Sequence, residues 1–229
     1  MNAVRGISKS KYILALAGGL AAAGGLYAWH RLRQFAPTRP KDAKDAAYIM
    51  LQGGQKVLAF SAHPDDLELF AGGVLRRLHL LGNDITVVDC SNGELSRPVQ
   101  NLGRHRRQEQ QRAGRILGYD EIKYLGLPDR ALDSTDLKGQ VRRLIDQEKP
   151  HLVLTIDHVH LHPWLYHRDH FALGEAVVHA INEQDSDALV YLYASAKPNV
   201  LVDIGTVIRQ KARALSNHAS QFPAFCPGH

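Results

Sequence analysis

The heptapeptide Ala-His-Pro-Asp-Asp-Leu-Glu occupies residues 62–68 and lies between two apolar stretches. The residues before it, 57–60, form a short continuous apolar run of the kind found in strands that are buried on both faces. The residues after it, 69–75, have the pattern of a helix that begins there. One imidazole and three carboxylates therefore follow the carboxyl end of a strand, which is where open α/β sheets bind ligands. Because neighbouring carboxylates repel one another unless a cation neutralises them, this stretch indicates a divalent metal.

A second polar cluster, Tyr-His-Arg-Asp-His at residues 166–170, has the same setting later in the chain. It separates an apolar, strand-like run at 152–156 from a helix-like run at 171–181. Two imidazoles and an Asp at a second strand end can complete a His/Asp/His site. Nitrogen and oxygen ligands of this kind suit Zn²⁺ with an open position for water.

Short strand-like runs alternate with longer helix-like runs over most of the chain. This alternation predicts a Rossmann-like, three-layer α/β/α fold with a mostly parallel sheet. The Gly-Gly pair at 72–73 lacks the spacing of a dinucleotide fingerprint. We expect strands at 57–61, 85–89, 122–125, 152–156, 189–193 and 201–204, and helices at 67–81, 104–117, 137–148, 171–182 and 208–220.

Composition limits the functional classes. A chain of 229 residues with 45% hydrophobic content is long enough for one globular domain with a proper core. The net charge of +5 is spread along the chain and only 7% of the residues are aromatic, so nucleic-acid binding is not expected. The two cysteines, Cys90 and Cys226, lack the spacing of metal ligands, which leaves a metal site to histidines and carboxylates.

The N-terminus is expected to be a separate unit. Tyr12–Trp29 carries no charge, has basic residues on both sides, and reaches the lower limit of length for crossing a bilayer. We therefore predict a hydrophobic helix that serves as a single-pass membrane anchor. A cleaved export signal and a buried or surface helix remain alternatives. The expected division is 1–33 as the transmembrane or signal-anchor segment, 34–50 as a linker, and 51–229 as the folded domain.

The order of motifs resembles the PIG-L/LmbE-like family of metal-dependent N-deacetylases. The resemblance covers about residues 55–221 and rests on several blocks in the expected order. They are His-Pro-Asp-Asp-x-Glu at 63–68, Gly-Gly at 72–73, Gly-Glu at 93–94, Arg-x-x-Glu at 106–109, Leu-Gly-Leu-Pro-Asp-Arg at 125–130, His-x-Asp-His at 167–170, Val-Asp-Ile at 202–204, and His-x-Ser-Gln at 218–221.

The resemblance implies hydrolysis of the N-acetyl amide of an N-acetylglucosaminyl conjugate, which releases acetate and a free amine, with Zn²⁺ or another divalent metal as cofactor. It identifies 51–229 as the deacetylase domain and a small glycoconjugate as the partner, and it leaves the oligomeric state and the aglycone open. The roles that it implies are metal ligation for His63, Asp66 and His170, general base for Asp65, oxyanion stabilisation or proton donation for His167, and substrate contact for Arg106 and Asp129.

Two further residues are expected to support the site without reacting. Asp169 can orient His167 or a ligand, and Glu68 lies in the first turn of a helix, beside the cluster. The alternatives are also structural. An Asp in this position favours a helix N-cap, and Arg106 with Glu109 has the spacing of a helical ion pair.

One departure from the family pattern supports a rival hypothesis. Arg168 stands where most members carry proline in His-Pro-Asp-His. If this change moved His167, the chain would be a non-catalytic sugar- or metal-binding member of the same fold.

Overall fold

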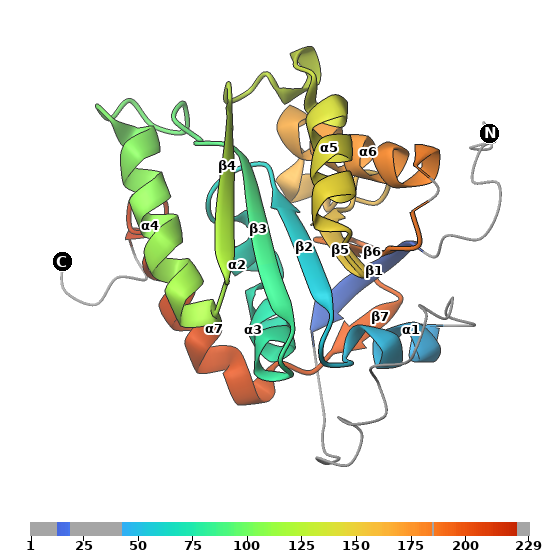
Figure 1. Ribbon diagram of the computed structural model, residues 1–229. Helices are drawn as coiled ribbons and strands as arrows, with labels where there is room; N and C mark the ends of the chain where they lie inside the picture. Colours follow the sequence, from blue (N-terminus) through green and yellow to red (C-terminus); the bar gives the residue numbers. More distant parts are fainter. Residues whose placement is uncertain (1–12, 19–42, 185, 224–229) are drawn as a thin grey trace.

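A seven-stranded sheet with neighbours in the order β4-β3-β2-β5-β6-β1-β7 forms the middle layer of the protein (Figure 1). The structure is a computed structural model that describes residues 13–18, 43–184 and 186–223. All the recorded strand pairs are parallel, as the alternation of strands and helices predicts. The strands are β1 (Ile13–Gly18), β2 (Lys56–Ser61), β3 (Asp84–Ser91), β4 (Glu121–Leu127), β5 (Leu152–Ile156), β6 (Leu189–Tyr193) and β7 (Val200–Val202).

Helices cover both faces of the sheet, which confirms the three-layer prediction. The α-helices are α1 (Ala43–Met50), α2 (Asp66–Phe70), α3 (Gly72–Leu80), α4 (Leu102–Leu117), α5 (Leu137–Glu148), α6 (Arg168–Glu183) and α7 (Ile208–Leu215). Single 3₁₀ turns lie at η2 (Leu132–Ser134), η3 (Pro163–Leu165) and η4 (Gly205–Val207).

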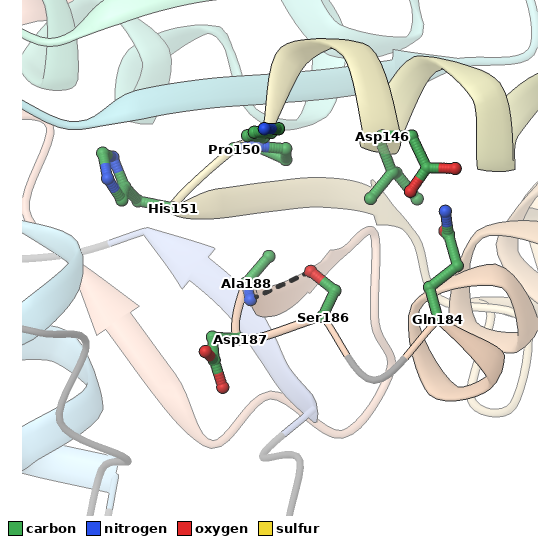
Figure 2. A pocket seen from close by; sticks show the side chains of 9 residues that line it. Asp146, Pro150, His151, Gln184, Ser186, Asp187 and Ala188 are labelled. Carbon is green, nitrogen blue, oxygen red and sulfur yellow. Dashed lines mark hydrogen bonds between the residues drawn. The ribbon is translucent and has the colours of Figure 1, made fainter.

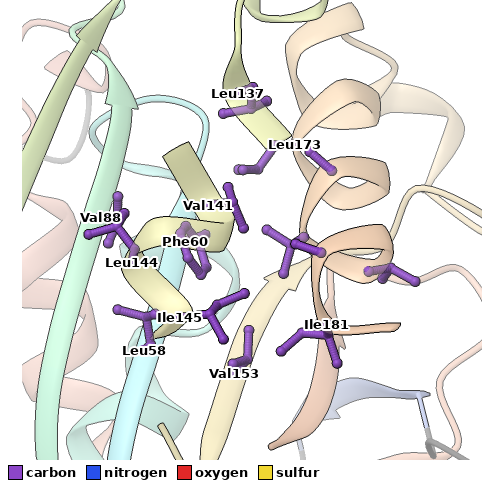
Figure 3. Packing of buried hydrophobic residues seen from close by; sticks show 14 of the residues in the cluster. Leu58, Phe60, Val88, Leu137, Val141, Leu144, Ile145, Val153, Leu173 and Ile181 are labelled. Atoms are coloured by element: carbon purple, nitrogen blue, oxygen red, sulfur yellow. The ribbon is translucent and has the colours of Figure 1, made fainter. Parts of the chain in front are cut away.

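Strand β2 shows how two cores arise from one strand. Its side chains alternate in direction, so Val57 and Ala59 join a cluster with α1, α2 and α3, while Leu58 and Phe60 join a cluster with α5 and α6. Figure 3 shows the second cluster, in which side chains of α5 and α6 meet those of β2, β3 and β5. Burial on both faces explains why the sequence of this strand is apolar throughout.

The order of the strands places the two polar clusters side by side. From β2 the chain proceeds outward to β3 and β4, and then returns to β5 on the other side of β2. The carboxyl ends of β2 and β5 therefore flank the point where the strand order reverses, which is the usual ligand crevice of an open α/β sheet. The heptapeptide follows β2, and the His-x-Asp-His motif follows β5.

The prediction of an N-terminal membrane anchor is wrong. Residues 13–18 of the apolar run form strand β1, which pairs in parallel with β6 and β7. Within 13–18, 43–184 and 186–223, no helix is long and apolar enough to cross a membrane. A short apolar run without charges fits a strand as well as a helix, and here the run forms a strand that pairs with β6 on one side and with β7 on the other. The rest of the predicted segment, 1–12 and 19–33, lies outside the described residues.

Two smaller differences concern the predicted linker and first helix. The last part of the expected linker forms α1, which buries Ala46 and Met50 and accepts a hydrogen bond from the Tyr191 hydroxyl at the Ala46 carbonyl, 2.8 Å away. The helix expected at 67–81 is divided at Ala71 into α2 and α3. Asp66 and Glu68 therefore lie on the short helix α2 and not on the longer helix α3 that follows it.

Candidate active site

The loop after β2 is closed by the carboxylate of Asp66. Its Oδ2 atom accepts hydrogen bonds from the backbone amides of Ala62 and His63, both at 3.0 Å. The intervening Asp65 has a φ of 120°, a conformation that L-residues rarely adopt and that costs about 1–3 kcal/mol. The Asp66 carboxylate therefore compensates for a strained loop that presents His63 and Asp65.

Three buried side chains converge in front of this loop. The Nε2 atom of His170, at the start of α6, lies 3.2 Å from Oδ1 of Asp66, and Nδ1 of His63 lies 3.7 Å from Oδ2 of Asp66. The Nδ1 atom of His170 is 3.0 Å from the Leu165 carbonyl oxygen, which can only accept, so Nδ1 carries a proton. In the neutral ring, Nε2 of His170 then keeps its lone pair and faces Asp66.

The other nitrogen of His63 faces two carboxylates. Its Nε2 atom lies 3.2 Å from Oδ2 of Asp169 and 3.4 Å from Oδ1 of Asp129. Asp169 also accepts hydrogen bonds from the backbone amides of Arg130 at 2.7 Å and Leu132 at 3.1 Å. The carboxylate of Asp169 thus orients His63, in the way that a carboxylate commonly orients a metal-binding histidine.

Two groups of side chains have the spacing of metal ligands, and both include His63. One contains Asp66 and His170, and the other contains Asp129, His167 and Asp169. In the second group, Asp169 is occupied by amide donors, and so is Oδ2 of Asp129, which accepts from the Leu95 amide at 2.7 Å. In the first, the amides of Ala62 and His63 occupy Oδ2 of Asp66, while its Oδ1 atom faces Nε2 of His170 at 3.2 Å. The donor set of His63, Asp66 and His170 therefore fits a divalent cation better.

The protonation of this group follows from its charges. Burial disfavours the cation of His63, but hydrogen bonds to Asp129 and Asp169 and the charge of Asp66 outweigh it and raise the pKa of His63 to about 10. Burial also disfavours the cation of His170, but Asp66 outweighs it and raises the pKa of His170 above its ordinary value. Burial would raise the pKa of Asp66, but the two histidines hold it well below its usual range. A metal ion would therefore displace protons from these imidazoles when it binds.

Asp65 lies beside this group and pairs with Arg106. The guanidinium Nη2 of Arg106 is 3.1 Å from Oδ2 of Asp65 and 2.6 Å from the Pro64 carbonyl oxygen. Burial raises the pKa of Asp65, Arg106 lowers it and Asp66 raises it, with a net value of about 7. A carboxyl group that titrates near neutral pH is well matched to proton transfer.

Arg106 is itself only 3% exposed. Its Nη1 atom donates to the Gly93 carbonyl at 2.9 Å and to the Ser96 hydroxyl at 3.1 Å. A Cβ atom at Gly93 would lie 2.1 Å from Nη1, so only glycine allows this approach. Substrate contact by Arg106 stays a prediction, because these donors are directed to the protein.

His167 occupies the open side of the site and serves as the N-cap of α6. Its Nδ1 atom accepts the backbone amide of Asp169 at 3.3 Å, so the proton of the neutral ring lies on Nε2. Burial and the neighbouring His63 and His170 lower the pKa of His167, which favours that neutral form. Its ring centroid is 4.9 Å from that of His63. His167 can therefore present an Nε2–H donor next to the candidate metal ligands.

The departure at Arg168 leaves His167 in place. Arg168 is exposed, and its guanidinium pairs with the carboxylate of Asp133 outside the site. His167 has φ −137° and ψ 136°, an extended backbone that does not need a following proline. The geometry expected to suffer from this change is therefore intact.

Sequence reasoning missed a buried carboxyl group beneath the loop. Asp89, in β3, is 0% exposed, and its Oδ1 atom accepts a hydrogen bond from the Ser61 hydroxyl. Burial raises the pKa of Asp89, the Ser61 hydrogen bond lowers it and the charge of Glu68 raises it, to about 8. The available signal was a lone Asp between Val88 and Cys90 in an otherwise apolar strand.

One cleft lies away from these side chains. It has a volume of about 310 Å³ and is located near the amino ends of β5 and β6, at the sheet edge opposite the polar clusters (Figure 2). None of the predicted site residues lines it. Its lining residues are Ile145, Asp146, Lys149, Pro150, His151, Gln184, Ser186, Asp187 and Ala188. The candidate ligands His63, Asp66 and His170 lie instead beyond the carboxyl ends of β2 and β5.

The chain resembles known proteins in sequence. Residues 58–181 match the family described as PIG-L, GlcNAc-PI de-N-acetylase. The chain is 30% identical over 194 residues to the diacetylchitobiose deacetylase of Thermococcus kodakarensis, a match that covers 74% of this chain and 71% of that protein. It is 28% identical over 193 residues to a probable N-acetyl-alpha-D-glucosaminyl L-malate deacetylase 2 of Bacillus cereus, covering 73% and 84%.

A solved structure extends the comparison to three dimensions. The N,N'-diacetylchitobiose deacetylase from Pyrococcus horikoshii, solved with an inhibitor, aligns with a TM-score of 0.67 at 26% identity. The alignment covers 79% of this chain and 77% of that chain. The structural similarity therefore extends over most of both chains.

Replacement of Asp89 by Asn should change how stability depends on pH. Between its ordinary pKa of 3.8 and about 8, Asp89 keeps its proton only in the folded state, so unfolding releases a proton and the free energy of unfolding falls as pH rises. The slope is at most about 1.4 kcal/mol per pH unit. Asp89→Asn cannot titrate, so its stability relative to the wild type should increase from pH 4 to pH 8 in urea unfolding. A constant difference across that range would contradict a protonated Asp89.

Proposed function

This chain belongs to the PIG-L family of GlcNAc-PI de-N-acetylases, and from that membership we propose that it is a metal-dependent hydrolase of N-acetylglucosaminyl conjugates. The reaction cleaves the N-acetyl amide and releases acetate and a free amine. The observation that carries the proposal is that His63, Asp66 and His170 converge, that Asp65 directly precedes Asp66, and that the ring centroid of His167 lies 4.9 Å from that of His63 and 5.3 Å from that of His170.

We propose Zn²⁺ as the metal, held by His63, Asp66 and His170, because two imidazoles and one carboxylate form a ligand set that zinc hydrolases use. When bound, the ion supplies a more acidic water and polarises the acetamide carbonyl. The protein supplies the orientation. Asp169 fixes the ring of His63 through Nε2, and the Leu165 carbonyl fixes that of His170 through Nδ1.

Asp65 is proposed as the general base. Asp65 directly precedes the candidate ligand Asp66, and its backbone has the strained φ of 120°. Arg106 holds its Oδ2 atom at 3.1 Å and so limits its rotation. A base fixed in this way can take a proton from the attacking water and pass it to the leaving amine.

His167 is proposed as the donor that stabilises the developing oxyanion. The Asp169 amide fixes the ring through Nδ1, which leaves Nε2–H as the donor. Its side chain is 37% exposed, which leaves access for a substrate from solvent. A donor whose orientation is fixed before the reaction needs no reorganisation in the transition state. Asp129, whose Oδ1 atom faces His63 at 3.4 Å, remains a proposed substrate contact with Arg106.

The rival hypothesis is a sugar-binding protein without activity, and a deacetylation assay distinguishes the two. Zinc-loaded protein should release acetate and a primary amine in equal amounts from at least one N-acetylglucosaminyl conjugate with a chitobiose, malate or phosphatidylinositol aglycone. Elemental analysis should find about one divalent ion per chain. Chelation or His170→Ala should abolish release, whereas His151→Ala, at the opposite edge of the sheet, should not. Metal and sugar binding without acetate release from any conjugate would support the rival.

Asp65→Asn should keep the metal and lose activity. The amide side chain has a similar shape but cannot accept the proton, so kcat should fall by roughly 10²–10⁴-fold. Asp133→Asn is the matched control, since Asp133 pairs with Arg168 outside the site. Steady-state kinetics with elemental analysis measure both effects. A near-normal kcat in Asp65→Asn would assign the base to another residue.

His167→Ala should lower kcat by roughly 10²–10³-fold, the range for loss of one oxyanion donor, with a smaller change in KM. The matched control is His179→Ala, an exposed histidine on the same helix. If KM rose while kcat stayed constant, His167 would have a role in substrate binding instead.

A further inference from the structure

The C-terminal part of the described chain packs against helix α2. We name α7 and the turns after it, residues 208–221, the C-terminal brace. The Nζ atom of Lys211, in α7, donates to the carbonyl of Leu69, in α2, at 2.8 Å. The two segments are more than a hundred residues apart in sequence, yet they lie directly against each other.

The second contact between the brace and α2 is a buried pair. His218 and Glu68 are both 0% exposed, and Nε2 of His218 lies 3.3 Å from Oε2 of Glu68. The other carboxylate oxygen of Glu68 accepts hydrogen bonds from the Tyr119 hydroxyl at 2.7 Å and the Gln110 amide at 3.2 Å. Because a buried carboxylate is costly unless it is paired, removal of His218 would leave Glu68 with an uncompensated charge.

The brace also contacts the elements that hold Asp65. The amide and hydroxyl of Ser220 donate to Glu109 at 2.9 and 2.6 Å. Glu109 is one helical turn after Arg106 on α4, and Arg106 in turn pairs with Asp65. The Gln221 carbonyl accepts from Arg97, in the loop between β3 and α4, at 3.0 Å. The brace therefore contacts α2, which follows the candidate base Asp65, and α4, which carries its partner Arg106.

External support of this kind matters because α2 is short. It has 5 residues, and a helix of that length is unstable unless tertiary contacts hold it. The residue that precedes it, Asp65, has a strained backbone, which persists only where the surroundings over-determine it. Glu68 lies within one helical turn of Asp65 and Asp66. A contact that fixes the position of Glu68 therefore also limits the movement of those two residues.

We propose that His218 and Glu68 are positioning residues, whose buried pair fixes α2 so that Asp65 and Asp66 meet the metal and the substrate in working geometry. Neither residue belongs to the group of ligand atoms around His63. The inference rests on the proposed function for the roles of Asp65 and Asp66. It extends the site to a segment at the far end of the chain.

The test compares Glu68→Gln, His218→Gln and the double variant with the wild type. Metal affinity is measured by competition with a chromophoric Zn²⁺ chelator, activity by kcat and KM, and stability by urea unfolding. Each single variant should bind Zn²⁺ roughly 10- to 100-fold more weakly, as expected when a group that supports a ligand is lost. In each, kcat should fall while KM changes little. The double variant should recover part of both losses relative to His218→Gln, because an amide in place of the Glu68 carboxylate carries no unpaired charge.

Tyr191→Phe is the control for stability alone. It removes a buried side-chain hydrogen bond to the Ala46 carbonyl, away from α2, and should leave Zn²⁺ affinity and kcat unchanged. If the Glu68 and His218 variants behaved like this control, with lower stability only, the proposal would be overturned. If His218→Gln failed to fold, Glu68→Gln alone, which keeps an Oε1 acceptor for Tyr119 and Gln110, would have to lower kcat without raising KM. Unchanged kcat in that variant would overturn the proposal as well.

The deacetylase function and the positioning role of His218 and Glu68 can be refuted separately. A wild-type protein that binds Zn²⁺ but releases no acetate would refute the deacetylase function, while the zinc-affinity comparison would still test the brace. Normal wild-type deacetylation with unchanged zinc affinity and kcat in all brace variants would refute the positioning role alone.

Discussion

The buried carboxylate of Asp66 is the interaction on which the rest of the site depends. One oxygen closes the loop after β2 by accepting two backbone amides, and the other faces His170 from the loop after β5. A single side chain therefore joins the two strand ends at the point where the sheet order reverses. Its charge is tolerated because imidazoles surround it, and a divalent cation would neutralise it further.

The surrounding side chains form two sides with different tasks. On the side of Asp66 and His170, Oδ1 of Asp66 and Nε2 of His170 face each other at 3.2 Å, whereas on the side of Asp129 and Asp169 backbone amides occupy Oδ2 of Asp129 and both oxygens of Asp169. His63 lies between them and presents one nitrogen to each. This division assigns binding to the first side and orientation to the second, although both sides have a composition that suits a metal.

Much of this arrangement can be predicted from the sequence, since apolar runs locate the strands and the polar motifs follow β2 and β5 directly. Long-range pairing could not be predicted. Nothing in the spacing of Arg106 indicates that it donates to the Pro64 and Gly93 carbonyls, and the partner of Glu68 lies at the other end of the chain. The apolar N-terminal run failed as a helix prediction for the related reason that strand pairing is decided by neighbours distant in sequence.

The most direct test of this account is anomalous diffraction from zinc-loaded crystals, measured on both sides of the zinc absorption edge. The account predicts one strong anomalous peak per chain, bonded to His63, Asp66 and His170, with Asp169 hydrogen-bonded to His63 from the opposite side. A peak bonded instead to Asp129, Asp169 and His167, or no peak at the carboxyl ends of β2 and β5, would contradict it.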